Sequence, residues 1–202
     1  MKKILILFAH PRYEKSRANR ALLRGLTGLE NVTVHDLYEE YPQFDIDVPR
    51  EQKLLRAHDI IVWHYPLYLY GPPAIIKQWM DLVLEHGWAH GEGGNHLAGK
   101  AVFNVITSGG TRTSFSHDGF NRYPLEELLR PLEQATRLCR MLWLPPFAVQ
   151  GTYRLSDALL ADYAGRYRRL LTALAETYDF EGIKKVELLN DWVADLIRKE
   201  QP

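Results

Sequence analysis

The chain has 202 residues, of which 46% are hydrophobic, enough for one sizeable core, and we expect a single domain. Its 25 basic residues balance 25 acidic ones, so there is no net field that would attract nucleic acid or an anionic membrane surface. A compact ligand or a protein partner is the better expectation.

Two features bear on the cellular compartment. Cys139 is the single cysteine, which excludes an internal disulfide, and inside a helical pattern it is expected to be a small buried apolar residue. The apolar run before His10 is too short for the core of a signal peptide and far too short to span a bilayer. The sequence therefore predicts a cytoplasmic protein.

The first predicted strand, residues 4–9, breaks at His10 into a polar, basic loop, after which Ser16 can cap a helix. A helix start gathers unpaired backbone N–H groups and the positive end of the helix dipole, so it stabilises an anion. A phosphate monoester would fit this start together with the Ser16 hydroxyl, the Asn19 amide and basic Arg17. An ordinary solvated loop with a serine cap explains these residues equally well when the loop is taken alone. Neither GxGxxG nor GxxxxGK[ST] is present.

Strand and helix patterns alternate five times along the chain. This alternation is typical of a parallel sheet with helices on both faces, because parallel neighbours need crossover connections. The predicted loops are 38–48, 86–96 and 111–123, and the predicted strands are 4–9, 31–37, 59–63, 100–107 and 143–151. Helices are predicted from Ser16, over 49–58, after Pro73, over about 125–141 with a bend or restart at Pro131, after the Ser156 cap, and as an amphipathic pattern within 179–202.

In such sheets ligands bind beyond the carboxyl ends of the strands, where the strand order reverses, so the loops after strands one, three and four should share a site. The loop at 66–71 follows Tyr65 and contains Tyr68 and Tyr70, which could line a flat ring or simply pack. The loop at 107–110, TSGG, lets a ring approach the backbone, although a tight turn with positive φ is an equal alternative.

The motifs AHP with SxAN, HYPLYLYGPPAIIKQWMD and TSGG together resemble the flavodoxin-like NAD(P)H quinone reductase family. The stretches NVTVHDLYEEYPQFDIDVPREQ, HGWAHGEGGNHLAGK and MLWLPPF more closely resemble the cytosolic ancillary subunits of glutathione-regulated potassium efflux antiporters. The resemblance implies a flavodoxin-like α/β fold with a five-stranded parallel sheet of order 2-1-3-4-5. It assigns a flavin-binding domain to residues 1–178 and leaves 179–202 as a C-terminal amphipathic helical extension.

The resemblance also implies FMN as the cofactor, with FAD less favoured, and NAD(P)H as the hydride donor to a quinone. The contacts that it implies for the FMN phosphate and ribityl chain are His10, Ser16, Arg17, Ala18 and Asn19. Those that it implies for the isoalloxazine ring are Pro66, Leu67, Tyr68, Leu69, Thr107, Ser108, Gly109 and Gly110.

Two functions follow from the resemblance. One is an FMN-dependent NAD(P)H:quinone oxidoreductase, homodimeric, that also regulates a potassium efflux antiporter and is peripheral to the inner membrane through that partner. The alternative is a regulatory binding subunit with little or no turnover. Quinone reductases of the family place a tyrosine and a histidine after the glycine pair; here Phe115 stands nearest to the tyrosine and cannot donate a proton. His117 is the candidate catalytic residue, and the Phe115 substitution slightly favours the regulatory alternative.

His86, His90 and His96 form a second histidine cluster. Three imidazoles can bind zinc, but the glycines between them provide no helix to align the rings, and no carboxylate or thiolate is fixed beside them. We therefore expect no metal site, and we expect this loop to lie over the flavin.

Overall fold

The computed structural model describes residues 1–177 and 179–200. At its centre is a parallel sheet of order β2-β1-β3-β4-β5, in which β6 also pairs with β4. The strands are β1 (Ile4–Phe8), β2 (Val32–Asp36), β3 (Ile60–Pro66), β4 (Ala101–Ser108), β5 (Leu142–Trp143) and β6 (Phe147–Gln150). The predicted flavodoxin-like strand order is confirmed. The predicted domain boundary at 178 and the last two residues of the extension, 201–202, lie outside the described residues.

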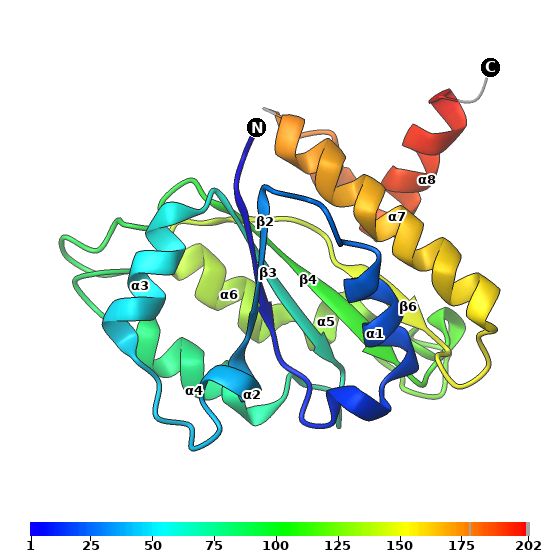
Figure 1. Ribbon diagram of the computed structural model, residues 1–202, viewed down its shortest axis with the longest axis horizontal. Helices are drawn as coiled ribbons and strands as arrows, with labels where there is room; N and C mark the ends of the chain where they lie inside the picture. Colours follow the sequence, from blue (N-terminus) through cyan, green and yellow to red (C-terminus); the bar gives the residue numbers. More distant parts are fainter. Residues whose placement is uncertain (178, 201–202) are drawn as a thin grey trace.

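Helices cover both faces of the sheet (Figure 1). Because β1, β3 and β4 are covered on both sides, they are continuous apolar runs rather than alternating ones, and all their residues are buried. One face carries α1 (Arg17–Arg24), α7 (Asp157–Glu176) and α8 (Leu189–Glu200). The other face carries α2 (Leu37–Glu40), α3 (Val48–Ala57), α4 (Ala74–Val83), α5 (Leu125–Leu128) and α6 (Arg130–Leu138).

The described residues also form three 3-10 helices: η1 (Tyr13–Lys15), η2 (Arg112–Ser114) and η3 (Ile183–Lys185). Two predicted helix starts are confirmed by their caps. The Ser16 side chain accepts the backbone N–H of Asn19 at the start of α1, and Ser156 accepts that of Leu159 at the start of α7. Cys139 is buried, as predicted, and so are Trp63 and Trp79.

Prolines explain one departure from the predicted element bounds and one helix restart that was predicted. The single strand predicted over 143–151 is split into β5 and β6, because Pro145 and Pro146 have no N–H to donate to the ladder. The sheet therefore has six strand segments rather than five. The predicted helix over 125–141 restarts as expected, with Pro131 in the first turn of α6.

Two loop predictions were wrong at their edges. The segment predicted as a loop at 38–48 begins within α2, because Asp36 caps that helix by accepting the backbone N–H groups of Tyr38 and Glu39. Strand β3 continues to Pro66, so Tyr65 is a buried strand residue whose hydroxyl donates to Asn104. The loop after β3 therefore starts only at Leu67.

The C-terminal helix packs on its own subunit. Leu189 and Val193 of α8 are fully buried in the core face that α7 also covers. The Asn190 side chain pairs with the backbone of Ala148 as a neighbouring strand would. Its Oδ1 accepts the Ala148 N–H at 2.8 Å, and its Nδ2 donates to the Ala148 carbonyl at 3.0 Å. This contact closes the exposed side of β6. No helix among the described residues is long and apolar enough to cross a bilayer.

Candidate functional site

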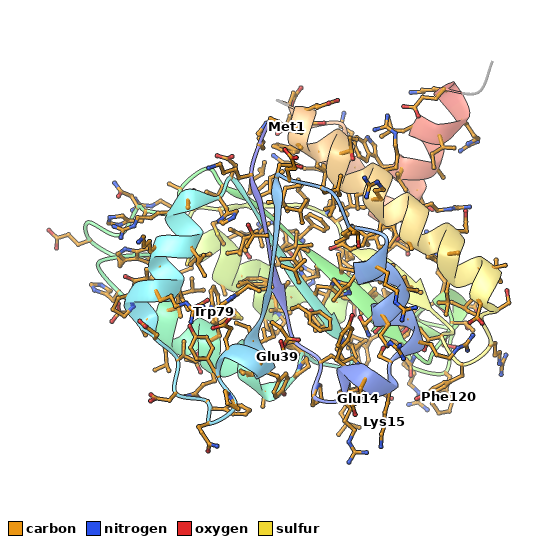
Figure 2. The ribbon with its side chains drawn as sticks, viewed as in Figure 1. Met1, Glu14, Lys15, Glu39, Trp79 and Phe120 are labelled. Carbon is orange, nitrogen blue, oxygen red and sulfur yellow. The ribbon has the colours of Figure 1, made fainter. Side chains whose placement is uncertain are left out.

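Two adjoining hollows lie beyond the carboxyl ends of β1, β3 and β4. We call them the helix-side hollow, of about 330 Å³, and the loop-side hollow, of about 310 Å³. They share Leu67, Ser108 and Gly109 in their walls. Figure 2 shows Lys15, beside the first, and Phe120, beside the second, at the end of the molecule opposite Met1. The loops that the sequence assigned to one site do meet.

Every residue predicted to contact the cofactor lines one or both of these hollows. The helix-side hollow is lined by the predicted residues His10, Ser16, Arg17, Ala18, Asn19, Pro66, Leu67, Tyr68, Thr107, Ser108 and Gly109, and also by Lys15, Thr152 and Tyr153. The loop-side hollow is lined by the predicted residues Leu67, Leu69, Ser108, Gly109 and Gly110, and also by Tyr70, Ser114, Phe115, Phe120 and Asn121.

The start of α1 presents donors to the helix-side hollow. The N–H of Asn19 is taken by Ser16 Oγ at 3.2 Å, and that of Arg20 by the Ser16 carbonyl at 3.3 Å. The first two N–H groups of the helix, those of Arg17 and Ala18, have no partner within a helix by geometry. Together with the positive end of the helix dipole they suit an anion such as a phosphate.

The Arg17 side chain is engaged elsewhere. Its guanidinium donates to Asp157 at 2.6 Å and to the Leu155 carbonyl at 3.1 Å, which ties α1 to the start of α7. Arg17 can therefore serve an anion in the helix-side hollow through its backbone N–H while its side chain holds α7.

The glycine pair is required for a close approach. A Cβ added at Gly109 would lie 2.4 Å from the Tyr153 ring, and one added at Gly110 would lie 2.9 Å from the Phe115 ring. Neither glycine has a positive φ, so the alternative of a turn that needs positive φ does not explain them. The turn is fixed by the Ser108 hydroxyl, which donates to the Gly110 carbonyl at 2.9 Å. The missing side chains make room for the Tyr153 and Phe115 rings, and the backbone of the pair lines the two hollows, where a flat ring could approach it.

The loop after β3 is a strained turn. Leu69 and Tyr70 have positive φ values of 46° and 68°, and Tyr68 and Gly71 close the turn with two backbone hydrogen bonds of 3.0 and 3.1 Å. This geometry leaves the Leu69 side chain 96% exposed. Strain of this kind persists where the surroundings hold it and is concentrated at ligand sites.

His10 is held as a neutral imidazole. Its Nδ1 accepts the backbone N–H of Arg12 at 3.0 Å, and its Nε2 lies 3.3 Å from the Tyr68 hydroxyl. Burial lowers the pKa of His10 below its ordinary value, against the smaller opposing effects of a hydrogen bond to its own backbone and of the charge on Glu14. His10 therefore joins the end of β1 to the loop after β3 without adding a positive charge.

A buried histidine that the sequence analysis did not single out lies beneath the helix-side hollow. His64, on β3, is fully buried, and its Nε2 is 3.0 Å from Oδ1 of Asn19. A signal was present: a histidine inside an apolar strand must find a partner. Thr152 and Tyr153 were also missed, although they follow β6 and a loop after that strand must reach the same sheet edge.

The histidine predicted to be catalytic lies outside both hollows. The His117 side chain is 70% exposed, and its Nε2 lies 3.3 Å from Glu127. Phe115 lines the loop-side hollow, where the Tyr70 hydroxyl donates to Asn121 at 3.3 Å. The catalytic role of His117 stays a prediction.

The second histidine cluster is divided between different contacts. The rings of His86 and His90 meet edge to face with centroids 5.6 Å apart, whereas His96 stacks on Trp88 and its Nδ1 lies 3.0 Å from the Trp88 carbonyl. Within residues 1–177 and 179–200, no three histidine, cysteine or acidic side chains are grouped so that they could hold a metal ion.

Comparison with known proteins agrees with this geometry. A family model described as a flavodoxin-like fold matches residues 2–171. The chain belongs to this flavodoxin-like family. It is 52% identical over 165 residues to the glutathione-regulated potassium-efflux system ancillary protein KefG of Shigella flexneri, covering 82% of this chain and 90% of that protein. It is 48% identical over 171 residues to KefG of an Enterobacter species, covering 85% and 93%. The predicted resemblance to the ancillary subunits is confirmed.

Solved structures of flavodoxin-like proteins are also similar. General stress protein 14 of Treponema denticola, solved in complex with FMN, superposes with a TM-score of 0.82 at 35% identity, covering 85% of this chain and 99% of that one. An NADPH-quinone reductase of P. pentosaceus superposes with a TM-score of 0.76 at 30% identity, covering 83% and 96%. The similar structures thus include an FMN complex and a quinone reductase.

Proposed function

We propose that this protein binds FMN across the two hollows and catalyses two-electron transfer from NAD(P)H to a quinone. One observation carries the proposal: the residues predicted for the FMN phosphate and those predicted for its ring line two hollows that share a wall. We favour FMN over FAD because a structure 35% identical to this chain was solved with FMN.

The phosphate would lie at the start of α1, with the backbone N–H groups of Arg17 and Ala18 and the hydroxyl of Ser16 as donors. The ribityl chain would pass His10 and Asn19, and the ring would lie against the backbone at Gly109 and Gly110. FMN, when bound, supplies the hydride acceptance and donation. The chain supplies binding, orientation and backbone N–H groups near the glycine pair that stabilise negative charge.

The substrate side of the site would be the loop-side hollow. Phe115 and Phe120 offer apolar contact there to a quinone ring, and Tyr70 and Asn121 offer polar contact. His117 remains the predicted proton donor. Because it lies on the exposed segment that follows Phe115, its side chain would have to move toward the loop-side hollow to reach a quinone there.

A second function rests on the relatives. Proteins about 50% identical to this chain are named ancillary proteins of a potassium efflux system. We propose that this protein acts in the cytoplasm and docks on a potassium efflux antiporter, which places it at the inner membrane through that partner. The absence of a hydroxyl at Phe115 supports a regulatory role with little turnover as the alternative to efficient quinone reduction.

We also propose a homodimer in which the second subunit covers part of the site. Leu69 and Phe120, both lining the loop-side hollow, are 96% and 88% exposed. Apolar side chains exposed to this extent beside a ligand site suit an interface. Sedimentation equilibrium tests this directly: we expect a dimer, and a Leu69→Asp variant shifted toward monomer.

The visible spectrum of the purified protein, with and without added FMN, tests the cofactor. A preparation that stays free of flavin absorbance after FMN is added overturns the proposal. Steady-state NAD(P)H oxidation with a short-chain quinone then separates the two functions. Turnover supports the reductase, whereas bleaching of the flavin by NAD(P)H without turnover supports the regulatory subunit.

A further inference from the structure

A buried hydrogen-bonded chain runs from the middle of the sheet to the rim of the helix-side hollow. It starts at His64 on β3, which is fully buried, and passes to Asn19 on α1, which is 1% exposed. His64 Nε2 and Asn19 Oδ1 are 3.0 Å apart. The chain ends at two hydroxyls on the wall of the hollow, those of Ser16 and Thr107.

The Asn19 amide has a definite direction in this chain. Its Nδ2 donates both hydrogens, to Ser16 Oγ at 2.9 Å and to Thr107 Oγ1 at 3.1 Å. Its Oδ1 is the end that faces His64, and a carbonyl oxygen can only accept. His64 must therefore carry its hydrogen on Nε2. With this tautomer, Asn19 is satisfied at both ends of its side chain.

The direction of the amide decides what the two hydroxyls can do. Ser16 Oγ accepts from Nδ2 and also from the backbone N–H of Asn19 at 3.2 Å, so its lone pairs are occupied. Thr107 Oγ1 accepts one bond from the same amide. A hydroxyl that already accepts has its own hydrogen left to donate. Both hydroxyls line the helix-side hollow, so they are prepared to donate to an anion there.

We propose that His64 is a positioning residue: by donating to Asn19 it fixes the amide so that the hydroxyls of Ser16 and Thr107 donate to an anionic ligand in the helix-side hollow. The proposal deepens the proposed function, on which it rests for the identity of the anion as the FMN phosphate. If the amide were reversed, its oxygen would face both hydroxyls, which would then donate to Asn19 instead of to the ligand.

The surroundings of His64 suit this role. The His64 ring packs edge to face against the rings of Phe8 and Tyr167. The ring centroids of these two pairs are 5.2 and 5.6 Å apart, and the ring planes are nearly perpendicular. Burial, and in second place the charge that His10 would carry, lowers the pKa of His64 to about 3. The ring therefore stays neutral and has one N–H. Its Nδ1 has no hydrogen-bond partner among the described residues, so the bond to Asn19 is the polar contact that orients it.

Titration of flavin-free protein with FMN, followed by flavin fluorescence, tests the proposal without any turnover. We expect His64→Leu to weaken FMN binding about tenfold, which is about 1.4 kcal/mol. Riboflavin has no phosphate and should be affected less. His64→Gln keeps a donor at this position and should restore most of the FMN affinity. Tyr167→Phe, which keeps the aromatic ring that packs against His64 and removes only its hydroxyl, is the matched control and should bind FMN like the unchanged protein.

A double-mutant cycle tests whether His64 acts through Asn19. In an Asn19→Ala background, His64→Leu should cause little additional loss of FMN affinity. A folded His64→Leu protein, judged by circular dichroism, that binds FMN with unchanged affinity overturns the proposal, and so does a fully additive cycle.

Nitrogen NMR of the histidine rings in the flavin-free protein gives a readout that does not depend on FMN. We expect the hydrogen of His64 on Nε2, and a hydrogen on Nδ1 overturns the proposal. If the unchanged protein binds no FMN, the proposed function fails. The position of the hydrogen on His64 then still shows whether His64 donates to Asn19.

Discussion

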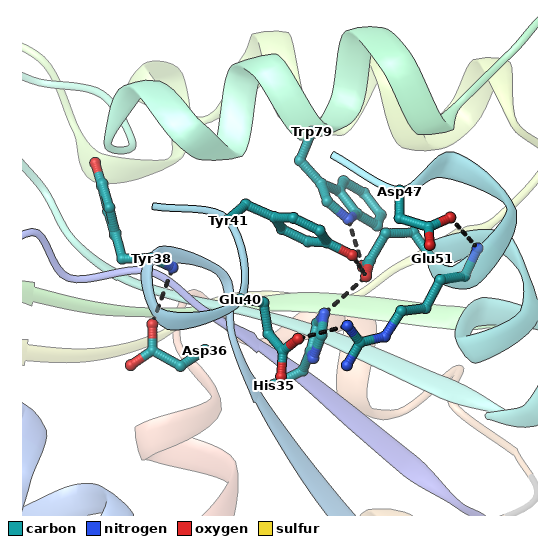
Figure 3. Close-up of polar contacts among 9 residues, drawn as sticks. His35, Asp36, Tyr38, Glu40, Tyr41, Asp47, Glu51 and Trp79 are labelled. Atoms are coloured by element: carbon teal, nitrogen blue, oxygen red, sulfur yellow. Dashed lines mark hydrogen bonds and ion pairs between the residues drawn. The ribbon is translucent and has the colours of Figure 1, made fainter. Parts of the chain in front are cut away.

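His35 Nε2 lies 2.8 Å from Oε1 of Glu51, and both side chains are buried. Glu51 also accepts from the Tyr41 hydroxyl at 2.6 Å and from the Trp79 indole N–H at 2.8 Å (Figure 3). One carboxylate on α3 thus joins β2, the segment after α2, and α4. This charge is well satisfied, because three donors reach it.

Removing this carboxylate should strongly destabilise the fold. In Glu51→Ala the three buried donors lose their acceptor, and we expect a loss of about 3 kcal/mol in the free energy of unfolding. Urea denaturation measures it. Glu39→Ala, at an exposed glutamate on α2, is the control and should cost under about 0.5 kcal/mol. Equal losses in the two variants would contradict the role of Glu51 as a buried hub.

The same carboxylate predicts how stability depends on pH. Burial by itself would raise the pKa of Glu51, but the hydrogen bonds from His35, Tyr41 and Trp79 outweigh it and hold the pKa below the ordinary value of 4.5. A carboxyl with a lowered folded-state pKa contributes stability that is complete above its unfolded pKa and is lost as the pH falls through the folded one.

The difference in unfolding free energy between the unchanged protein and Glu51→Gln should therefore be constant from pH 7 down to about 5. It should shrink as the pH falls below 4.5. Urea midpoints measured across this range give the profile. A difference that stays constant below pH 4 would show that the carboxylate is not preferentially ionised in the folded protein.

Ser16→Asp should expel the proposed phosphate without disturbing the helix. Aspartate caps a helix as well as serine does, so α1 should keep its start. The added carboxylate would face the anion, and we expect FMN binding to weaken at least tenfold, about 1.4 kcal/mol. Ser156→Asp makes the same change at the cap of α7, which lines neither hollow, and should bind FMN normally. Full flavin occupancy in Ser16→Asp would place the phosphate elsewhere.

Gly110→Ala should disturb the loop-side hollow. The new methyl group would lie 2.9 Å from the Phe115 ring, which is itself buried, so the ring or the loop must move. Overpacking of this kind costs about 1–3 kcal/mol, and a flavin ring against the same backbone should bind more weakly. The control is Gly165→Ala in α7, where no atom beyond the neighbouring residues and the backbone of the helix itself lies within 4 Å of the added Cβ. It should stabilise the protein by about 0.5–1 kcal/mol, which thermal unfolding can measure.

His117→Ala tests the predicted proton donor. If His117 protonates the quinone, kcat should fall about a hundredfold or more, while the FMN dissociation constant stays the same because the residue lines neither hollow. His96→Ala removes an exposed histidine that stacks on Trp88 and should leave kcat unchanged. An unchanged kcat in both variants would exclude His117 and direct attention to Tyr70, whose hydroxyl lies at the loop-side hollow.

The sequence by itself determined the order of the elements and the place of the site. Continuous apolar runs such as residues 59–63 need two covered faces, serine caps such as Ser16 and Ser156 are local signals, and the ends of parallel strands must meet at one edge. These features depend on neighbours in the chain. The residues that the family resemblance implies for the cofactor all line the two hollows.

Only the tertiary structure decided which polar residues are buried and with whom. Glu51 stands beside polar residues of α3 and looks like a solvated glutamate in the sequence, but residues 16 and 28 positions away supply its donors. The bond between His64 and Asn19 spans 45 residues and joins β3 to α1. Such pairs form where crossover connections bring distant segments together. The hydrophobic periodicity of the sequence cannot predict them, because it indicates only which face of an element is apolar.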